Sequence, residues 1–376
     1  MYHPGNVPPH LLPELAYPAY VRIVLPITPS TPTHEYHLLK TPVVSVVLPY
    51  RNAASTLDEC LQSILVQSYT DFELLTINDR SNDESEQIVK HYRKQDKRLR
   101  VLASPRKGLV AALNFGLHTA KGKFIARMDA DDRMRPDRLR QQVETLELHT
   151  SWSLVACQVH LFPEQSIQAG YQEYIRWQNQ CLTPADIAAD IYLESPFVHP
   201  SVTYRRADIL NLGGYREGNF AEDYDLWLRM HQAGLGMAKL PEILLDWRDS
   251  PRRLSRIDPR CSQQAFAQLR AHYLAKDSRL KRHRPLVMWG AGRKTRQRCR
   301  LLMEQGFMPI AWVDIDPKKI GRQIQGAPVV EPAWLLQRHP KPLVLVYVRN
   351  HGAREGIQAF LAKATYQRSR DFLFIG

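Results

Sequence analysis

From Thr41 onward, short apolar segments rich in β-branched residues alternate with segments whose apolar residues recur at helical spacing. Residues 43–50 (VVSVVLPY) form the first strand-like segment, and residues 55–68 follow as a helix with Ser55 as its expected cap. Further strands and helices are expected at residues 72–79, 84–95, 99–104, 108–120 and 123–130. This alternation predicts an α/β fold with a mostly parallel sheet flanked by helices.

Polar loops follow the four expected strands. Their sequences are PYRN (residues 49–52), NDRSNDES (78–85), PRKG (105–108) and DADD (129–132). Because the carboxyl ends of parallel strands meet at one edge of a sheet, the four loops should share one rim. Ligands of open α/β sheets bind at this edge, so the sequence predicts the functional site there.

Four aspartates lie within residues 129–137, directly after the fourth expected strand. Carboxylates this close repel unless a cation lies between them or solvent spreads the charge. On an extended segment Asp129 and Asp131 would point to the same side, whereas Asp132 would point oppositely or begin the turn. A same-side pair suits a hard divalent cation that also binds a diphosphate. Asp137 is expected to stabilise the first turn of the next helix.

The net charge favours an anionic partner, because the chain has 51 basic and 38 acidic side chains and therefore a formal charge of +13. A nucleotide, a phospholipid surface and nucleic acid all satisfy this condition. No nucleic-acid-binding signature is visible, so nucleic acid is not expected as a partner. Many arginines fall in the C-terminal third, which predicts a basic face on that part of the chain.

The chain has no sequence signal for export or for a membrane span. No stretch reaches the roughly 18 to 20 consecutive apolar residues of a spanning helix, and the N-terminus lacks a basic-then-apolar signal pattern. The five cysteines are far apart and never form a C-x-x-C pair, so neither a disulfide framework nor a zinc site is expected. We therefore expect a cytoplasmic protein with reduced thiols.

Four zones are expected along the 376 residues, which exceed the usual length of a single domain. Residues 1–40 are a proline-rich, irregular extension, residues 41–258 are the α/β domain, residues 259–284 are a helical basic linker, and residues 285–376 are a second unit.

Strands and helices alternate again in the second unit, which predicts a small Rossmann-like domain. Its first expected strand ends in Gly290 and Gly292, but the third glycine of the G-x-G-x-x-G pattern is missing. Asp314 lies about 20 residues on, where a ribose-binding acid would be. The unit shows no catalytic acid–base set, so a nucleotide-linked ligand, a docking role and an assembly scaffold remain open alternatives.

Residues 41 to about 258 resemble the family 2 glycosyltransferases, which have the GT-A fold and use nucleotide-diphospho-sugar donors. Six segments carry the resemblance in order: SVVLPYRN, INDRSNDES, KGLVAALNFGL, ARMDADDRMRPDRL, HPSVTYRR and AEDYDLWLRM. The acidic turn departs from the family pattern at its first position, where Asn78 replaces the usual aspartate.

The resemblance implies roles for individual residues. Asp131 would be the principal ligand of a Mn²⁺ or Mg²⁺ ion that bridges the donor diphosphate, with Asp129 or Asp132 assisting. Asp79 would contact the base, and Asp83 lies in the same turn. The full set expected to bind the nucleotide-sugar is Pro49, Tyr50, Arg51, Asn52, Asp79, Asp83, Lys107, Asn114 and Asp129.

Sugar transfer also requires a base that removes a proton from the acceptor hydroxyl, and one positioned carboxylate suffices. Glu222 and Asp223 open an amphipathic segment, and by resemblance Asp223 is the general base of an inverting transfer. The alternative is that these acids only stabilise a helix N-terminus.

Three more residues are candidates for contact with the acceptor or the diphosphate. His199 lies in a His-Pro pair that the family commonly has, although a lone histidine is usually a structural hydrogen-bonding group. Arg252 and Arg253 lie in a basic segment, residues 246–256, that could fold over the diphosphate.

The sequence therefore favours an inverting, metal-dependent glycosyltransferase of the hexosyltransferase type, acting in cell-surface or exopolysaccharide biosynthesis. Its acceptor would be a glycan or a lipid-linked molecule, and family habit and the basic charge suggest peripheral association with the inner face of the membrane. A nucleotidyltransferase-like enzyme and a non-catalytic nucleotide-sugar-binding protein are the alternatives. The former normally has a glycine-rich phosphate loop after its first strand, and PYRNAAS is not one.

Overall fold

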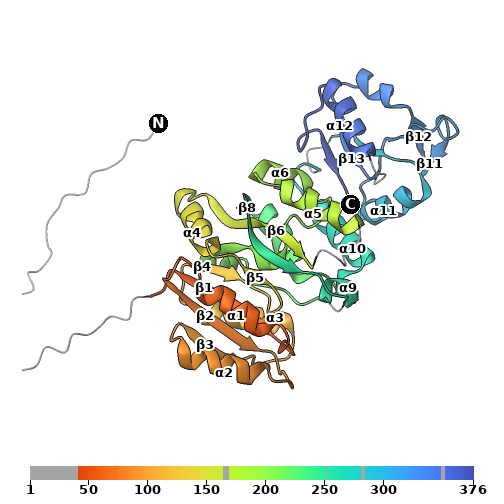
Figure 1. Cartoon of the computed structure of the whole chain (residues 1–376). Helices are drawn as coiled ribbons and strands as arrows, with labels where there is room; N and C mark the ends of the chain where they lie inside the picture. Colours follow the sequence, from red (N-terminus) through yellow and green to blue (C-terminus); the bar gives the residue numbers. More distant parts are fainter. Residues whose placement is uncertain (1–40, 164–168, 252, 281–283, 349–351) are drawn as a thin grey trace, which may run out of the picture. The chain divides into compact units, whose positions relative to one another are not determined.

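The computed structural model describes residues 41–163, 169–251, 253–280, 284–348 and 352–376 (Figure 1). Residues Thr41–Gly376 form one compact unit that contains an eight-stranded and a six-stranded sheet. The expected extension at residues 1–40 lies outside the described residues. The predicted α/β class with two mostly parallel sheets is confirmed.

The N-terminal half of the first sheet is parallel and has the order β3-β2-β1-β4. Its strands are β1 (Val44–Tyr50), β2 (Phe72–Asn78), β3 (Leu99–Ala103) and β4 (Phe124–Arg127). The connecting helices are α1 (Leu57–Leu65), α2 (Ser85–Gln95) and α3 (Leu109–Thr119). These elements match the sequence prediction, except that Thr56 rather than Ser55 occupies the N-cap position of α1.

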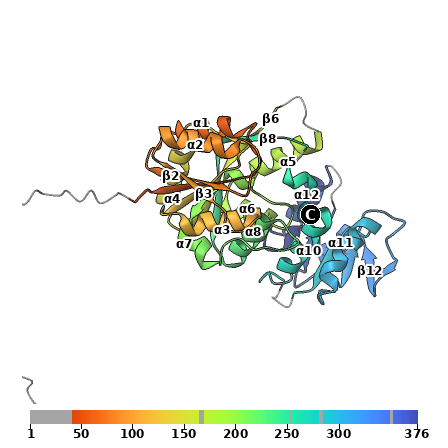
Figure 2. The ribbon, with the colours of Figure 1, turned by 90° about the horizontal axis from the view of Figure 1, so that it is seen from below.

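Helices cover both faces of this parallel half, with α1 and α2 on one side and α3 on the other (Figure 2). Every residue of β1 is buried as a result. Val46 packs into the hydrophobic cluster that contains α1, whereas its neighbour Val47 packs into the cluster that contains α3. The alternation of side chains along the strand sends successive valines to opposite faces.

Beyond β4 the sheet becomes mixed. The strands β7 (Thr203–Arg205) and β6 (Trp152–Phe162) are antiparallel to each other, β8 (Gly236–Arg248) is parallel to β6, and β5 (Arg133–Met134) is antiparallel to β8. The helices of this half are α4 (Arg138–Leu148), α5 (Ala169–Gln180), α6 (Pro184–Asp190), α7 (Arg206–Asn211) and α8 (Glu222–Gln232). The β5–β8 pairing places the end of β8 beside the aspartate loop.

The second sheet has the order β11-β12-β10-β9-β13-β14 and is parallel except for β11. Its strands are β9 (Leu286–Trp289), β10 (Ala311–Val313), β11 (Gln323–Ile324), β12 (Ala327–Val330), β13 (Leu343–Val346) and β14 (Phe372–Phe374). The helices α11 (Arg293–Met303) and α12 (Ala353–Lys363) connect its strands. The short β11–β12 hairpin was not predicted.

The helices α9 (Leu254–Ile257) and α10 (Gln263–Leu274) connect the two sheets. Asp277, after α10, accepts a hydrogen bond from the Tyr192 hydroxyl at 2.9 Å. Arg368 forms an ion pair with Asp190 at 2.6 Å. Whether residues 41–258 and 285–376 fold as separate domains stays a prediction. Within the described part of the chain, none of the helices has both the length and the apolar character that spanning a bilayer requires.

Candidate active site

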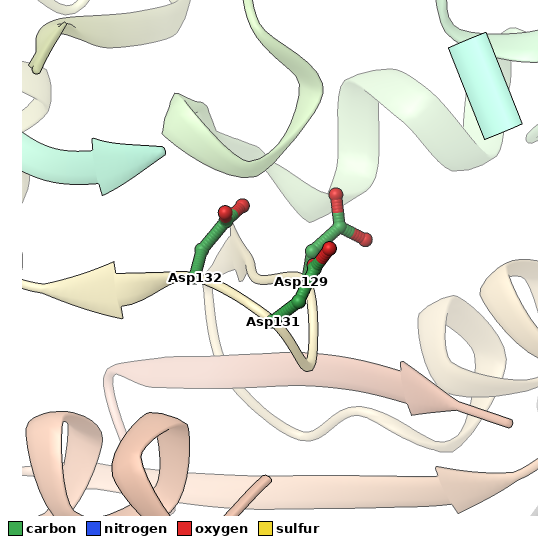
Figure 3. A group of neighbouring side chains, drawn as sticks. All are labelled: Asp129, Asp131 and Asp132. Carbon is green, nitrogen blue, oxygen red and sulfur yellow. The ribbon is translucent and has the colours of Figure 1, made fainter. Parts of the chain in front are cut away.

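The loop between β4 and β5 carries three carboxylates that converge. Asp129, Asp131 and Asp132 each offer an oxygen within 4.8 Å of the others, and all three side chains project from one turn (Figure 3). The Asp132 N–H lies 3.4 Å from the Asp129 carbonyl oxygen, which closes the turn. Because the backbone turns here, the alternation of an extended strand does not apply, and Asp132 does not point away from the other two.

Two arginines hold this loop in place. Arg127, buried at the end of β4, forms an ion pair with Asp129. Arg248, at the end of β8, donates from Nε to the Asp131 carbonyl oxygen at 2.7 Å and from its backbone N–H to Asp132 Oδ1 at 2.7 Å. Sequence reasoning missed both arginines. A charged residue inside the apolar β4 segment was the one available signal for Arg127.

Asp131 and Asp132 have raised pKa values. Burial, followed by the negative charge of Asp129, raises the pKa of Asp131 to about 6. Burial, followed by the charges of Asp131 and Asp129, raises the pKa of Asp132 well above its ordinary value. The Oδ2 atom of Asp132 is buried and has no hydrogen-bond partner among the described residues. A divalent cation bound between these carboxylates would offset their mutual repulsion.

A cavity of about 650 Å³ lies beside this loop, and candidate site residues from distant parts of the sequence line it. Asp129 and Asp131 line it from the β4–β5 loop, Glu222 and Asp223 line it from the first turn of α8, and His199 lines it from a short 3₁₀ turn. The fold thus brings the predicted metal-binding and base residues to one cavity. Asp132 does not line it.

At the start of α8, Glu222 is buried and Asp223 is half-buried. Burial, followed by the charge of Glu222, raises the pKa of Asp223 to about 7. Burial also raises the pKa of Glu222, and the Arg260 guanidinium lies 3.7 Å from its Oε2 atom. Arg260 was not a candidate from the sequence. An acid that titrates near neutral pH can accept a proton and release it again at the pH of the cell.

His199 is a buried residue with a structural hydrogen bond. Its Nε2 atom lies 3.0 Å from the Tyr215 hydroxyl, and its Nδ1 atom lies 3.9 Å from Glu222 Oε1. Burial, with a further contribution from the Arg127 charge, lowers the pKa of His199 well below its ordinary value. The ring is therefore neutral, and it lines the cavity between the aspartate loop and α8.

The loops after β1 and β2 are tied together at the same edge of the sheet. The backbone N–H of Asn82 donates to Asn52 Oδ1 at 2.9 Å, and the N–H of Ala54 donates to Asp83 Oδ2 at 3.0 Å. Burial tends to raise the pKa of Asp83, but hydrogen bonds from Ser85 and the Ala54 N–H lower it overall. These contacts bind Asn52 and Asp83 to each other's loops.

Asp79 connects these loops to the one after β3, because its Oδ1 atom accepts from the Gly108 N–H at 2.8 Å. Tyr50 is buried, and its hydroxyl has no hydrogen-bond partner among the described residues. Arg51 and Lys107 are exposed on this edge. Asp79, Tyr50, Arg51 and Lys107 do not line the 650 Å³ cavity and lie along a second part of the rim, whereas Asp129 of the expected nucleotide-binding set does line it.

Both polar atoms of the Asn114 side chain form hydrogen bonds with the backbone of Tyr215. Its Nδ2 atom donates to the Tyr215 carbonyl oxygen and its Oδ1 atom accepts from the Tyr215 N–H, each at 2.8 Å. Gly214 lies so close that a Cβ atom there would be 2.5 Å from Asn114 Oδ1. Asn114 therefore positions the segment that carries Tyr215.

The basic segment after β8 reaches the cavity through Arg253. Its guanidinium lies 3.6 Å from the centroid of the Trp247 ring and donates to the Tyr171 hydroxyl at 2.8 Å. Arg253, Trp247 and Tyr171 all line the cavity. Arg252, the other arginine expected here, lies outside the described residues.

Comparison with known proteins adds an independent line of evidence. The family described as "Glycosyl transferase family 2" matches residues 45–211. The putative glycosyltransferase EpsE of Bacillus subtilis is 33% identical over 213 residues, which cover 55% of this chain and 73% of EpsE. The O-antigen biosynthesis glycosyltransferase WbnJ of Escherichia coli is 30% identical over 209 residues, which cover 55% of this chain and 79% of WbnJ.

Among solved structures, S. aureus TarS 1-349 in complex with UDP-GlcNAc has a similar fold. It aligns with a TM-score of 0.51 at 17% identity, over 69% of this chain and 70% of that one. At this level of identity the likeness concerns the fold of the two chains.

Proposed function

We propose that this chain, which belongs to glycosyl transferase family 2, transfers a sugar from a nucleotide-diphospho-sugar to a hydroxyl group of a glycan or lipid-linked acceptor with inversion at the anomeric carbon. One observation carries the proposal: Asp131 and Asp223 line the same cavity although they are 92 positions apart in the sequence. Asp131 is suited to bind a metal ion next to the donor diphosphate, and Asp223 is suited to take the proton from the acceptor hydroxyl.

The aspartate loop fits a divalent cation. Three carboxylates that each offer an oxygen within 4.8 Å of the others match the oxygen ligands that Mn²⁺ and Mg²⁺ take. The Oδ2 atom of Asp132 is buried and has no hydrogen-bond partner in the part of the chain that the structure describes. Asp129, Asp131 and Asp132 would hold the ion. When bound, it would supply Lewis-acid stabilisation of the charge that develops on the leaving diphosphate.

Asp223 is the proposed general base. It would take the proton from the acceptor hydroxyl while the acceptor oxygen forms a bond to the anomeric carbon and the bond from that carbon to the diphosphate oxygen breaks. Burial, together with the negative charge of Glu222 beside it, raises the pKa of Asp223 and thereby makes it a better proton acceptor. Arg260 lies near Glu222 and can bind either that carboxylate or substrate oxygens.

The donor's nucleotide would lie along the rim formed by the loops after β1, β2 and β3. Asp79 and Tyr50 are buried there and provide polar groups at the edge of the sheet, while Arg51 and Lys107 provide exposed positive charge. Arg253 lines the cavity on the opposite side and is placed to contact the diphosphate.

The biological role of the proposed activity is the synthesis of a cell-surface or secreted polysaccharide. Related proteins carry names such as amylovoran biosynthesis glycosyltransferase AmsE and O-antigen biosynthesis glycosyltransferase WbnJ. We infer that the chain works in the cytoplasm, at the inner face of the membrane where lipid-linked acceptors are presented. The excess of basic residues supports contact with anionic lipid headgroups.

A screen of nucleotide-sugars tests the proposal. Binding and slow hydrolysis of each donor would be measured with Mn²⁺ and with EDTA, beginning with UDP-GlcNAc because TarS 1-349 was solved in complex with it. At least one donor should bind and be hydrolysed only when the metal is present. If no donor binds with Mn²⁺, the proposed reaction is wrong.

A further inference from the structure

A second cavity, of about 880 Å³, lies in the C-terminal sheet and shares no lining residue with the cavity of the candidate active site. It is located at the carboxyl ends of β9, β10 and β13, where Gly290, Asp314 and Tyr347 line it. From β9 the chain continues to β10 on one side and later to β13 on the other, so the strand order reverses beside β9. Open α/β sheets bind ligands at this type of reversal.

One end of the cavity is suited to phosphate groups. Gly292 is the N-cap residue of α11, no side chain caps the helix there, and a Cβ atom at Gly292 would meet nothing within 4 Å. Arg293 and Lys294 line the same end, and neither forms an ion pair within the described part of the chain. Open space in front of helix N–H groups, with two uncompensated cations beside it, attracts an anion.

The glycine turn that forms this end is held by Asp314. Its Oδ2 atom accepts a hydrogen bond from the Ala291 N–H at 2.8 Å and lies 3.2 Å from Lys319 Nζ. Gly290 has a φ of +111°, and a Cβ atom there would lie 2.9 Å from the Thr295 side chain. Asp314 lines the cavity, and its Oδ1 atom accepts from the Asp316 N–H at 2.9 Å and lies 3.4 Å from Lys319 Nζ. A hydroxyl group that binds Asp314 would take the place of this long Lys319 contact.

Ile315 supplies an apolar wall to this cavity. Its side chain, next to Asp314, is 78% exposed and lines the cavity. A bound molecule with a flat apolar part would cover this side chain and remove apolar surface from water.

We propose that this second cavity binds a small molecule with a ribonucleoside 5′-diphosphate moiety. The diphosphate lies at the start of α11 beside Arg293 and Lys294, a ribose hydroxyl donates to Asp314, and the base covers Ile315. The volume of 880 Å³ falls within the roughly 300 to 1,000 Å³ of small-molecule sites. The proposal does not depend on sugar transfer, because none of these residues belongs to the candidate active site.

Calorimetric titration of the whole chain tests this site. The titrations use an Asp131→Ala background in EDTA to remove metal-dependent binding at the active site, with ADP, UDP and NAD⁺ as probes and inorganic pyrophosphate for comparison. At least one nucleotide should bind with a dissociation constant below about 1 mM and at least about tenfold more tightly than pyrophosphate. No binding by any nucleotide, or equal binding of pyrophosphate, overturns the proposal.

A matched pair of double variants separates a specific site from general attraction to a basic helix. Arg293→Glu with Lys294→Glu should weaken nucleotide binding by at least about tenfold. Arg296→Glu with Arg300→Glu changes the net charge of the same helix equally, but these two residues do not line the cavity, so binding should stay within about twofold. Equal losses in both double variants contradict the proposal.

Gly292→Asp supplies a test that loss of folding cannot imitate. Aspartate is a favourable N-cap residue, so the thermal midpoint should be unchanged or higher, while its carboxylate occupies the phosphate position and should abolish binding. Unaltered nucleotide binding in Gly292→Asp overturns the assignment of this cavity.

Ile315→Ser tests the position of the base. It should weaken nucleotide binding and leave pyrophosphate binding unchanged.

Discussion

His199 and Tyr215 are hydrogen-bonded inside the candidate active site, with 3.0 Å between the histidine Nε2 atom and the tyrosine hydroxyl. The Tyr215 hydroxyl also lies 3.1 Å from that of Tyr204. Asn114 holds the Tyr215 backbone through two hydrogen bonds. This buried chain of contacts connects α3 to the wall of the cavity, so residues that touch no substrate control its shape.

Removal of Asn114 should therefore destabilise the protein. Asn114→Ala leaves the Tyr215 N–H and carbonyl group without their partners, which should lower the free energy of unfolding by about 1 to 3 kcal/mol. Urea unfolding followed by fluorescence measures this change. Asn211→Ala, at an exposed position at the end of α7, is the control and should change stability by less than about 0.5 kcal/mol.

Asp131 should be essential for metal-dependent donor binding, because it lines the cavity within the carboxylate cluster. Asp131→Ala should reduce Mn²⁺-dependent affinity and turnover by at least about 100-fold. Asp137→Ala is the matched control, because Asp137 belongs to the same run of aspartates but instead accepts hydrogen bonds from Ser68 and Arg140. Unchanged binding and turnover in Asp131→Ala would remove this residue from the metal site.

Asp223 should be needed for the chemical step and not for binding of the donor. Asp223→Asn preserves shape but cannot take the acceptor proton, so turnover should fall by about 10²- to 10⁴-fold while the donor dissociation constant stays within about threefold. Steady-state kinetics together with calorimetry separate the two effects. A variant that retains full turnover would exclude Asp223 as the base.

The pH dependence of turnover should report the same carboxylate. Burial and the charge of Glu222 raise the pKa of Asp223 to about 7, and a base works in its ionised form. Turnover should therefore rise with pH through about 7 and level off above it. Glu222→Gln removes one cause of the raised pKa, so the midpoint should move to lower pH. The same midpoint in both proteins would contradict this assignment.

Acid should weaken the connection between the two sheets. Asp277 is buried, and although burial tends to raise its pKa, hydrogen bonds from His231 and Arg279 and the positive charge of Arg279 lower it below the ordinary value. Because the folded-state pKa is the lower one, this contribution to stability is full above pH 4 and is lost as the pH falls further.

Asp277→Asn should lower the free energy of unfolding by about 3 kcal/mol at pH 7, because it leaves the Arg279 charge without its partner. The difference between the variant and the original chain should shrink as the pH falls below 4. Urea unfolding at several pH values measures both effects. A difference that does not depend on pH would show that the Asp277 charge is not responsible.

The sequence by itself determined the strands and helices of the parallel half of the first sheet, since apolar periodicity is a local property of the chain. In the second sheet it left out the β11–β12 hairpin. It also predicted that the loops after β1 to β4 share one edge, and that an aspartate cluster lies there. Asp137 lies at the N-cap position of α4, where the sequence placed it, but its side chain makes no capping hydrogen bond. These predictions needed only the spacing of neighbouring residues.

Only the tertiary structure decided which side chains meet. Arg127 pairs with Asp129, Arg248 holds Asp132, and the first turn of α8 adds Asp223 to the same cavity. Asn114 is bound to a backbone segment 101 residues away. These pairings depend on how the mixed part of the sheet is formed by β6, β7 and β8. The burial that raises the pKa of Asp223 to about 7 also exists only after these elements have packed together.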